Sequence, residues 1–296
     1  MYHPTCHLTR FLIYTNIAIM EFKRKLFLLE PFVNSKVWGV EQWIVSTMKD
    51  SSSFFYDNAK PVPVKTLTNS DYPLLIKTIH ADETLSVQVH PSDEYAMAHE
   101  NTHGKSECWY ILEAEPEATI ISGLNGNFTK EEIRLAIKEN RIESYLYETT
   151  VSKGDFLFIP AGTVHAIKGG VTILEIQQPS DLTYRLYDWN RNRETHIEKS
   201  LDVITNFVSK PVRNFSGAFE CDYFKIEKAS VNGKAEIKPL IGSCWASYFI
   251  IDGNGTFACN GEALDVKKGS TIFAAPDTTI TASGSFSVMK IYPKKY

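Results

Sequence analysis

The sequence has little of what a membrane-spanning, disulfide-rich or nucleic-acid-binding protein requires. Its 296 residues include only five cysteines, no two of them in a CxxC pair, which predicts free thiols in a reducing compartment. No run approaches the roughly 18–20 uninterrupted apolar residues of a membrane helix. With 31 basic against 35 acidic residues the net charge is −4, whereas phosphate contacts need a basic surface. We therefore expect a cytoplasmic protein with neither a membrane nor a nucleic acid as partner.

The composition is that of a globular protein made mainly of strands. Hydrophobic residues are 43% of the chain and charged residues 22%, ordinary values for a folded domain. Short segments rich in β-branched and aromatic residues, bounded by turn residues, recur from 85–90 to 286–292. Strands without alternating helices predict a sandwich or barrel. Two helices are expected, over 92–100 after Ser92 and over 128–148 as an insertion with a capping-box pattern.

Two positions divide the chain into segments. Residues 1–19 have the single basic residue Arg10 and a short, interrupted apolar core without a small-x-small cleavage site. A signal peptide is one interpretation of them; we favour a start of translation at Met20. A linker is expected near 209–217, and all eight histidines occur at or before His196. A second region, 213–296, therefore has no imidazole with which to bind a metal. The sequence also predicts turns in this region, at 252–255 and 260–261.

The most informative motif is G-x5-P-x-G-x2-H, from Gly154 to His165. Its first glycine suits a turn, residues 156–159 a strand, and Pro160 with Gly162 a second turn. His165 then begins the returning strand and is held rigidly, as a metal ligand must be. The motif resembles the second motif of the cupin superfamily. The alternative is a hairpin with an incidental histidine.

A companion motif lies upstream, where residues 85–91 alternate strictly between apolar and polar side chains. Ser86, Gln88 and His90 share one face of the predicted strand, which is natural for a strand that lines a polar cavity. Taken alone, such residues usually mark a solvated face. With Glu107 and His165, however, Gln88 and His90 make a plausible nitrogen and oxygen ligand set for a divalent metal.

These segments resemble a known family, the type I phosphomannose isomerases in their short bacterial form. The resemblance is carried by LSVQVHPSDEYA, GKSECWYIL, IPAGTVHAI and LEIQQPSDLTYRLYDWNR, and by the opening EPFVNSKVWG. It covers essentially all of 20–296 and implies two cupin-type (jelly-roll) β-barrel domains with a small helical insertion. The first, 20–212, would bind the metal and be catalytic, and the second, 213–296, would be a degenerate barrel without a metal site.

The resemblance also implies an activity and roles for individual residues. The family interconverts mannose 6-phosphate and fructose 6-phosphate and binds zinc, so we expect one Zn²⁺ per chain, although Mn, Fe and Co accept similar ligands. The implied metal ligands are Gln88, His90, Glu107 and His165. The implied substrate contacts are Ser86, Lys105 and Arg185. Arg185 and Lys105 would also be catalytic, and Glu175 resembles the acid implicated in proton transfer.

The chemistry of aldose–ketose isomerisation agrees with these residue types. A proton moves between C1 and C2 through a cis-enediolate, which needs an electrophile, a base within reach of both carbons and cations for the phosphate. Lys105 shares a predicted strand face with Glu107, so both can point into one cavity. Residues 20–212 hold 20 basic and 27 acidic side chains, a net charge of −7. An anionic substrate must therefore be bound by local cations and not by the overall field.

Other interpretations remain at this point. Lys105 alone could be a loop lysine, Arg185 a salt-bridge partner of Asp188, and Glu175 a solvent-facing strand residue. A non-catalytic sugar-binding or regulatory cupin is disfavoured, because all the implied ligands are present with Lys105 and Arg185. Another metal-dependent cupin enzyme, such as an iron dioxygenase, would more often carry histidine where Gln88 stands. The expected partner is a small sugar phosphate, and we expect a monomer or weak homo-oligomer.

Overall fold

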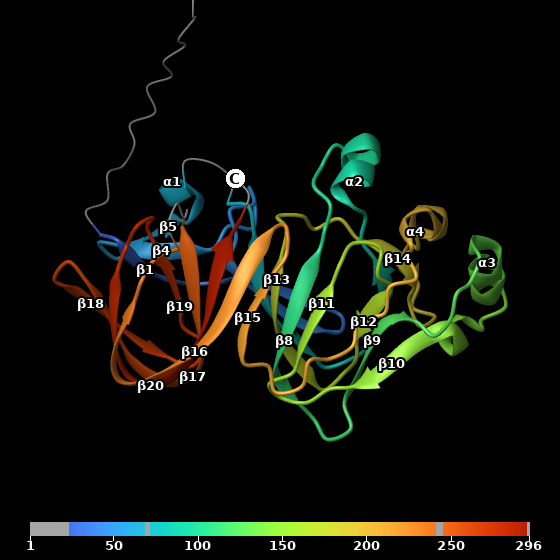
Figure 1. Ribbon diagram of the computed structural model, residues 1–296. Coiled ribbons are helices and arrows are strands. Elements are labelled where there is room, and N and C mark those ends of the chain that lie inside the picture. Colours follow the sequence, from blue (N-terminus) through green and yellow to red (C-terminus); the bar gives the residue numbers. More distant parts are fainter. Residues whose placement is uncertain (1–23, 69–71, 241–244, 295–296) are drawn as a thin grey trace, which may run out of the picture.

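The structure, a computed structural model, describes residues 24–68, 72–240 and 245–294. The expected start at Met20 and the segment before it lie outside these residues. The fold is mainly β, as predicted. Two sheets of the N-terminal region lie against one another, and a third, C-terminal sheet lies beside them (Figure 1). Within the described ranges, no helix combines the length and apolar character needed to cross a membrane.

Three large sheets and one hairpin make up the β structure. The six-stranded sheet has the order β11 (Phe156–Ile159), β8 (Glu107–Ala114), β13 (Val171–Gln177), β6 (Leu75–Ala81), β3 (Gly39–Val45) and β2 (Phe32–Lys36). The five-stranded sheet has the order β10 (Leu146–Thr150), β9 (Thr119–Leu124), β12 (His165–Ile167), β7 (Val87–Val89) and β14 (Tyr184–Tyr187). The seven-stranded sheet has the order β1 (Leu26–Leu29), β19 (Thr271–Ala274), β17 (Ala246–Cys259), β20 (Ile280–Pro293), β16 (Phe224–Ile237) and β15 (Gly217–Glu220), with β18 (Glu262–Lys267) on β17. The hairpin pairs β4 (Phe54–Asp57) with β5 (Lys60–Pro63).

The helices confirm one prediction in full and correct another. They are α1 (Lys65–Thr68), α2 (Asp93–Glu100), α3 (Lys130–Lys138), the 3₁₀ turn η1 (Ile142–Tyr145) and α4 (Ile197–Val203). Ser92 caps α2, and Thr129 and Glu132 form the expected capping box of α3. The helix predicted over 128–148 is too long: Asn140 adopts the left-handed region at φ 54°, which ends the helix, and residues 146–150 form β10. Helices α1 and α4 were not predicted from the sequence.

The packing places a closed interior between the six- and five-stranded sheets. Apolar side chains from both sheets, such as Ile79, Ile111 and Ile167, meet there. Helices α3 and α4 cover the outer face of the five-stranded sheet. The outer face of the six-stranded sheet packs on the seven-stranded sheet through residues such as Ile176 and Phe224. Side chains that alternate with Ile176 along β13 therefore point into the interior.

The first strand belongs to the C-terminal sheet, although it comes from the N-terminal end of the chain. β1 pairs antiparallel with β19, with Leu26 opposite Ala274. Its alternate side chains serve two cores: Leu26 packs inside the C-terminal sheet, and Phe27 packs in the cluster shared with the six-stranded sheet. The domain boundary at residue 212 stays a prediction, but β1 ties the two regions together.

One predicted turn of the C-terminal region is confirmed and the other is wrong. Asn260 and Gly261 both have positive φ and join β17 to β18, as a two-residue hairpin requires. Residues 252–255 instead continue β17 across a bulge. Their glycines allow close packing: a Cβ on Gly255 would lie 2.7 Å from the Phe286 ring.

Candidate active site

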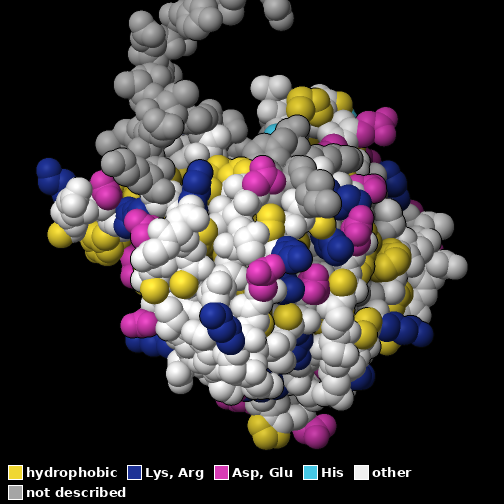
Figure 2. Space-filling view, turned by 60° about the vertical axis from the view of Figure 1, so that its left-hand side comes forward, with side chains coloured by type: hydrophobic (Ala, Val, Ile, Leu, Met, Phe, Trp, Pro, Cys, Tyr) yellow, Lys and Arg dark blue, Asp and Glu magenta, His cyan; other side chains and the backbone are white. Residues whose placement is uncertain are grey.

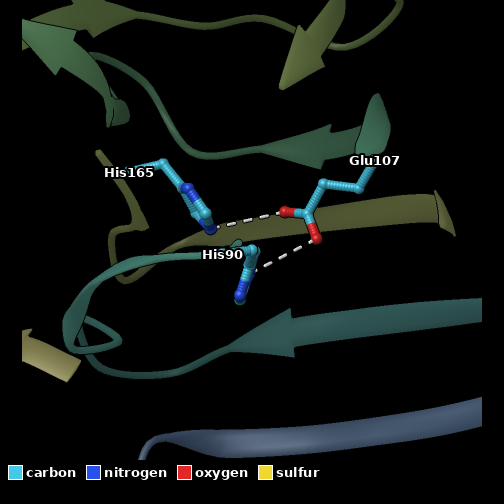
Figure 3. A group of neighbouring side chains, drawn as sticks. All are labelled: His90, Glu107 and His165. Carbon is cyan, nitrogen blue, oxygen red and sulfur yellow. Dashed lines mark ion pairs between the residues drawn. The ribbon is translucent and has the colours of Figure 1, made fainter. Parts of the chain in front are cut away.

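Three of the predicted metal ligands converge in the interior between the two sheets. His90 follows β7, Glu107 begins β8 and His165 begins β12 (Figure 3). Glu107 places Oε2 3.6 Å from His90 Nε2 and Oε1 3.4 Å from His165 Nε2. The three ligand atoms lie within 4.8 Å of one another, and all three residues are buried. Two imidazoles and a carboxylate at this spacing are a typical divalent-metal donor set.

The surroundings of both imidazoles prepare them to act as ligands. The Nδ1 atom of His90 lies 2.9 Å from the Leu182 carbonyl, and that of His165 2.8 Å from the Thr163 carbonyl. Each Nδ1–H therefore donates to the backbone and leaves Nε2 unprotonated, facing Glu107. Burial, reinforced by Lys105, lowers the pKa of His90 well below its usual value, and burial lowers that of His165 to about 4. Both rings are thus neutral near pH 7, the form that binds metals.

A second observation indicates that these residues suit a divalent metal. Among the described residues, the buried His165 Nε2 has no hydrogen-bond partner. Such atoms are costly to bury unless an ion or another group engages them. Gln88 lies directly opposite His165 in the β7–β12 pair, so both side chains lie on the same face of the sheet. This places the fourth predicted ligand beside the other three.

A polar cavity of about 380 Å³ adjoins this group. It contains all the predicted substrate and catalytic residues: Ser86, Lys105, Glu175 and Arg185, together with Gln88. Trp38 also lines it. Trp109 is instead fully buried, and its Nε1–H faces Glu107 Oε1 at 3.1 Å and Glu175 Oε2 at 3.0 Å. It therefore positions two carboxylates and does not wall the cavity.

A buried charge network surrounds Glu175 and was not predicted from the sequence. Lys77, on β6 opposite Glu175, lies 3.3 Å from Glu175 Oε1 and 3.9 Å from Glu41 Oε2. Burial and the neighbouring Glu107 raise the pKa of Glu175, and Lys77 opposes this shift. Burial acts to lower the pKa of Lys77, but Glu175 and Glu41 outweigh it and raise the value. The sequence did contain a sign of this network, a lysine inside the apolar run LLIKTIH. Lys77 is two residues from the inward-facing Ile79, so both side chains lie on the same face of the strand.

Arg185 reaches the cavity from β14, where it lies opposite Gln88. Its Nη1 donates to the Glu194 carbonyl at 2.5 Å, while its buried Nε has no hydrogen-bond partner among the described residues. The ion-pair partners of Asp188 in the described chain are Arg191 and Arg193, so the salt-bridge interpretation of Arg185 is not supported. His99 and His103 are exposed and lie outside this group of residues.

Comparisons with known proteins indicate the family of the chain. The family described as "Mannose-6-phosphate isomerase, cupin domain" matches residues 216–293. The chain is 40% identical to "Mannose-6-phosphate isomerase ManA" of Bacillus subtilis (strain 168) over 69% of each protein. It is 46% identical to the mannose-6-phosphate isomerase of Streptococcus mutans over 68% of this chain and 67% of that protein. Among solved structures, a mannose 6-phosphate isomerase from Bacillus subtilis is similar with a TM-score of 0.80 and 25% identity, over 90% of this chain and 99% of that one.

Proposed function

The chain belongs to the mannose-6-phosphate isomerase family, and from that premise we propose that it interconverts mannose 6-phosphate and fructose 6-phosphate in a metal-dependent reaction. The observation that carries this proposal is the buried group of His90, Glu107 and His165 beside a polar cavity. A bound divalent metal would supply Lewis-acid stabilisation for the negative charge that develops on the sugar oxygens. Gln88, His90, Glu107 and His165 would hold that metal, and we propose zinc as the ion.

The remaining polar residues of the cavity have two proposed roles, proton transfer and substrate binding. Glu175 is the proposed base that carries a proton between C1 and C2 through the cis-enediolate. Lys77, 3.3 Å away, favours its ionised form against burial and Glu107, and the Trp109 indole donates to its other oxygen. Ser86, Lys105 and Arg185 are the proposed contacts to the substrate and its phosphate, since a dianion requires hydroxyl and cationic partners.

The activity is tested by a coupled assay of mannose 6-phosphate conversion, with and without a chelator. We expect turnover that the chelator abolishes and added zinc restores. Turnover that is insensitive to exhaustive chelation would contradict the metal requirement. An absence of turnover in metal-replete protein would favour a non-catalytic sugar-binding cupin. Metal analysis of the purified protein shows which ion is bound.

The ligand assignment has its own test in His90→Ala. Because second-shell changes alone cost roughly 10–100-fold in metal affinity or activity, loss of this ligand should lower turnover by about 100-fold or more and reduce the bound metal. His103→Ala, at an exposed histidine, is the matched control and should retain both. Full activity in the His90 variant would refute the metal assignment.

The expected surroundings of the protein are part of the same proposal. Cys108, Cys221 and Cys259 are free thiols, which supports the expectation of a reducing, cytoplasmic location. On the face seen in Figure 2, basic and acidic side chains are interspersed. On this face the basic side chains do not gather into the patch that a nucleic acid partner would require. A monomer or weak homo-oligomer stays a prediction.

A further inference from the structure

Lys105 lies at the junction between the metal-ligand group and the substrate cavity. Its Nζ atom is 3.0 Å from His90 Nε2 and 3.1 Å from Glu107 Oε2. Its side chain is only 6% exposed, yet it lines the cavity, which the three ligand side chains do not. One buried ammonium group therefore contacts two of the prospective metal ligands from the substrate side.

The contact with His90 excludes a metal at the same atom. Because Nδ1–H of His90 donates to Leu182, Nε2 has a single free lone pair. An imidazole nitrogen can use that pair to accept a hydrogen bond or to bind a metal, but not both. Charge acts in the same direction: two cations on adjacent buried atoms repel strongly where water is excluded.

We propose that Lys105 is the built-in competitor of the metal. In the metal-free protein its ammonium group neutralises Glu107 and satisfies His90, and metal binding displaces it toward the substrate cavity. This inference rests on the metal-dependent function proposed above. It gives Lys105 two successive partners, the ligand group before metal binding and the substrate anion afterwards.

The structure offers the displaced side chain a place to go. Lysine has a flexible four-carbon stem, and the side chain of Lys105 already borders the cavity, as do Ser86 and Glu175. Glu175 is a buried carboxylate of the same cavity, and Lys77 lies 3.3 Å from its Oε1. A rotation about the Lys105 side chain therefore keeps its charge near a carboxylate and frees it for an anionic substrate.

The test compares zinc binding and stability in the wild-type protein and in Lys105→Met. We expect the dissociation constant for Zn²⁺, measured by competition with a chelator, to fall about tenfold in the variant. The wild-type protein must break the contact of Lys105 with His90 and Glu107 when zinc binds, and the variant has no such contact to break. The midpoint of thermal unfolding should fall for the metal-free variant and stay near the wild-type value when zinc is bound. Lys36→Met is the control, because Lys36 lines the same cavity but is exposed; it should change neither quantity.

Each outcome decides the matter. An unchanged or weaker zinc affinity in Lys105→Met would overturn the proposal, because Lys105 would then not compete with the metal. Failure of the wild-type protein to bind zinc would instead contradict the proposed function. If Lys105→Met folds only with zinc, Lys105→Gln should behave in the same way, and that result supports the role of counter-cation. If both variants remain unfolded in the presence of zinc, zinc does not replace the charge of Lys105, and the proposal is wrong.

Discussion

At the scale of single residues, the site depends on buried charges that hold one another in place. Glu175 and Lys77 are both buried and lie 3.3 Å apart on neighbouring strands. A buried charge is costly unless it is paired. Burial and Glu107 favour the protonated form of Glu175, whereas Lys77 favours the carboxylate. The balance between these effects sets the pH above which Glu175 can accept a proton.

Lys77→Met should therefore move the acidic limb of the pH–rate profile. Removing the cation raises the pKa of Glu175 further, so kcat/KM should begin to fall at a higher pH than in the wild-type protein. The profile of kcat/KM against pH measures this shift. Lys36→Met, at an exposed position of the same cavity, should leave the limb where it is. An unmoved limb in Lys77→Met would show that Glu175 is not the titrating base.

At the scale of elements, a tight turn links the segments that carry His90 and His165, the two histidines predicted to bind the metal. Gly162 has a φ of 88°, donates its N–H to the His90 carbonyl at 2.8 Å and accepts from the Thr205 N–H at 2.8 Å. A Cβ at this position would lie 2.6 Å from Thr205 Cγ2 and 2.8 Å from the Val203 carbonyl oxygen. The glycine of the P-x-G-x2-H motif is thus required by its conformation and by its close contacts.

Gly162→Ala should lower both stability and zinc affinity. Strain and overlap together should cost about 1–3 kcal/mol of unfolding free energy, and the shift of the His90 carbonyl should weaken metal binding. Gly261→Ala is the matched control, because Gly261 has a φ of 82° but nothing within 4 Å of its Cβ position. It should lose stability from backbone strain alone and bind zinc normally. Equal zinc affinity in the two variants would contradict a role of the turn in the site.

At the scale of the whole molecule, the two regions share one hydrophobic cluster. The cluster includes Phe27 of β1, Ile176 of the six-stranded sheet and Ile291 of the seven-stranded sheet. Phe27 is 1% exposed and packs edge-on against Phe55, with ring centroids 4.9 Å apart. Because this cluster backs the strand that carries Glu175, the C-terminal sheet supports the site without contributing to the ligand group.

Phe27→Ala should destabilise both regions together. Removing a buried phenylalanine should cost about 3–5 kcal/mol, and calorimetry should show a single transition at a lower temperature. Hydrogen exchange should quicken at Ile176 as well as at Ile291. Two separate transitions, only one of them moved, would show that the regions unfold independently. Phe257→Ala, inside the C-terminal sheet alone, provides the comparison.

Much of the site was predictable because its residues occupy strands with a period of two. Ser86, Gln88 and His90 alternate with apolar residues, and a turn motif precedes His165, so their common direction follows from local rules. Lys77 and Glu41 were not predictable in the same way. Each is a charged residue in a strand. Only the pairing of β3, β6 and β13 shows that Glu41, Lys77 and Glu175 are buried together.

The same distinction holds for the fold. By itself, the sequence determined the mainly β class, the capped starts of two helices and the family, because these depend on short patterns. The continuation of β17 through residues 252–255 and the placement of β1 in the C-terminal sheet were decided by tertiary structure. So was the position of Lys105 between ligand group and cavity. Those features depend on which distant segments meet. A hydrophobic pattern specifies that one face of a strand is buried, but it does not specify which other strand or sheet covers that face.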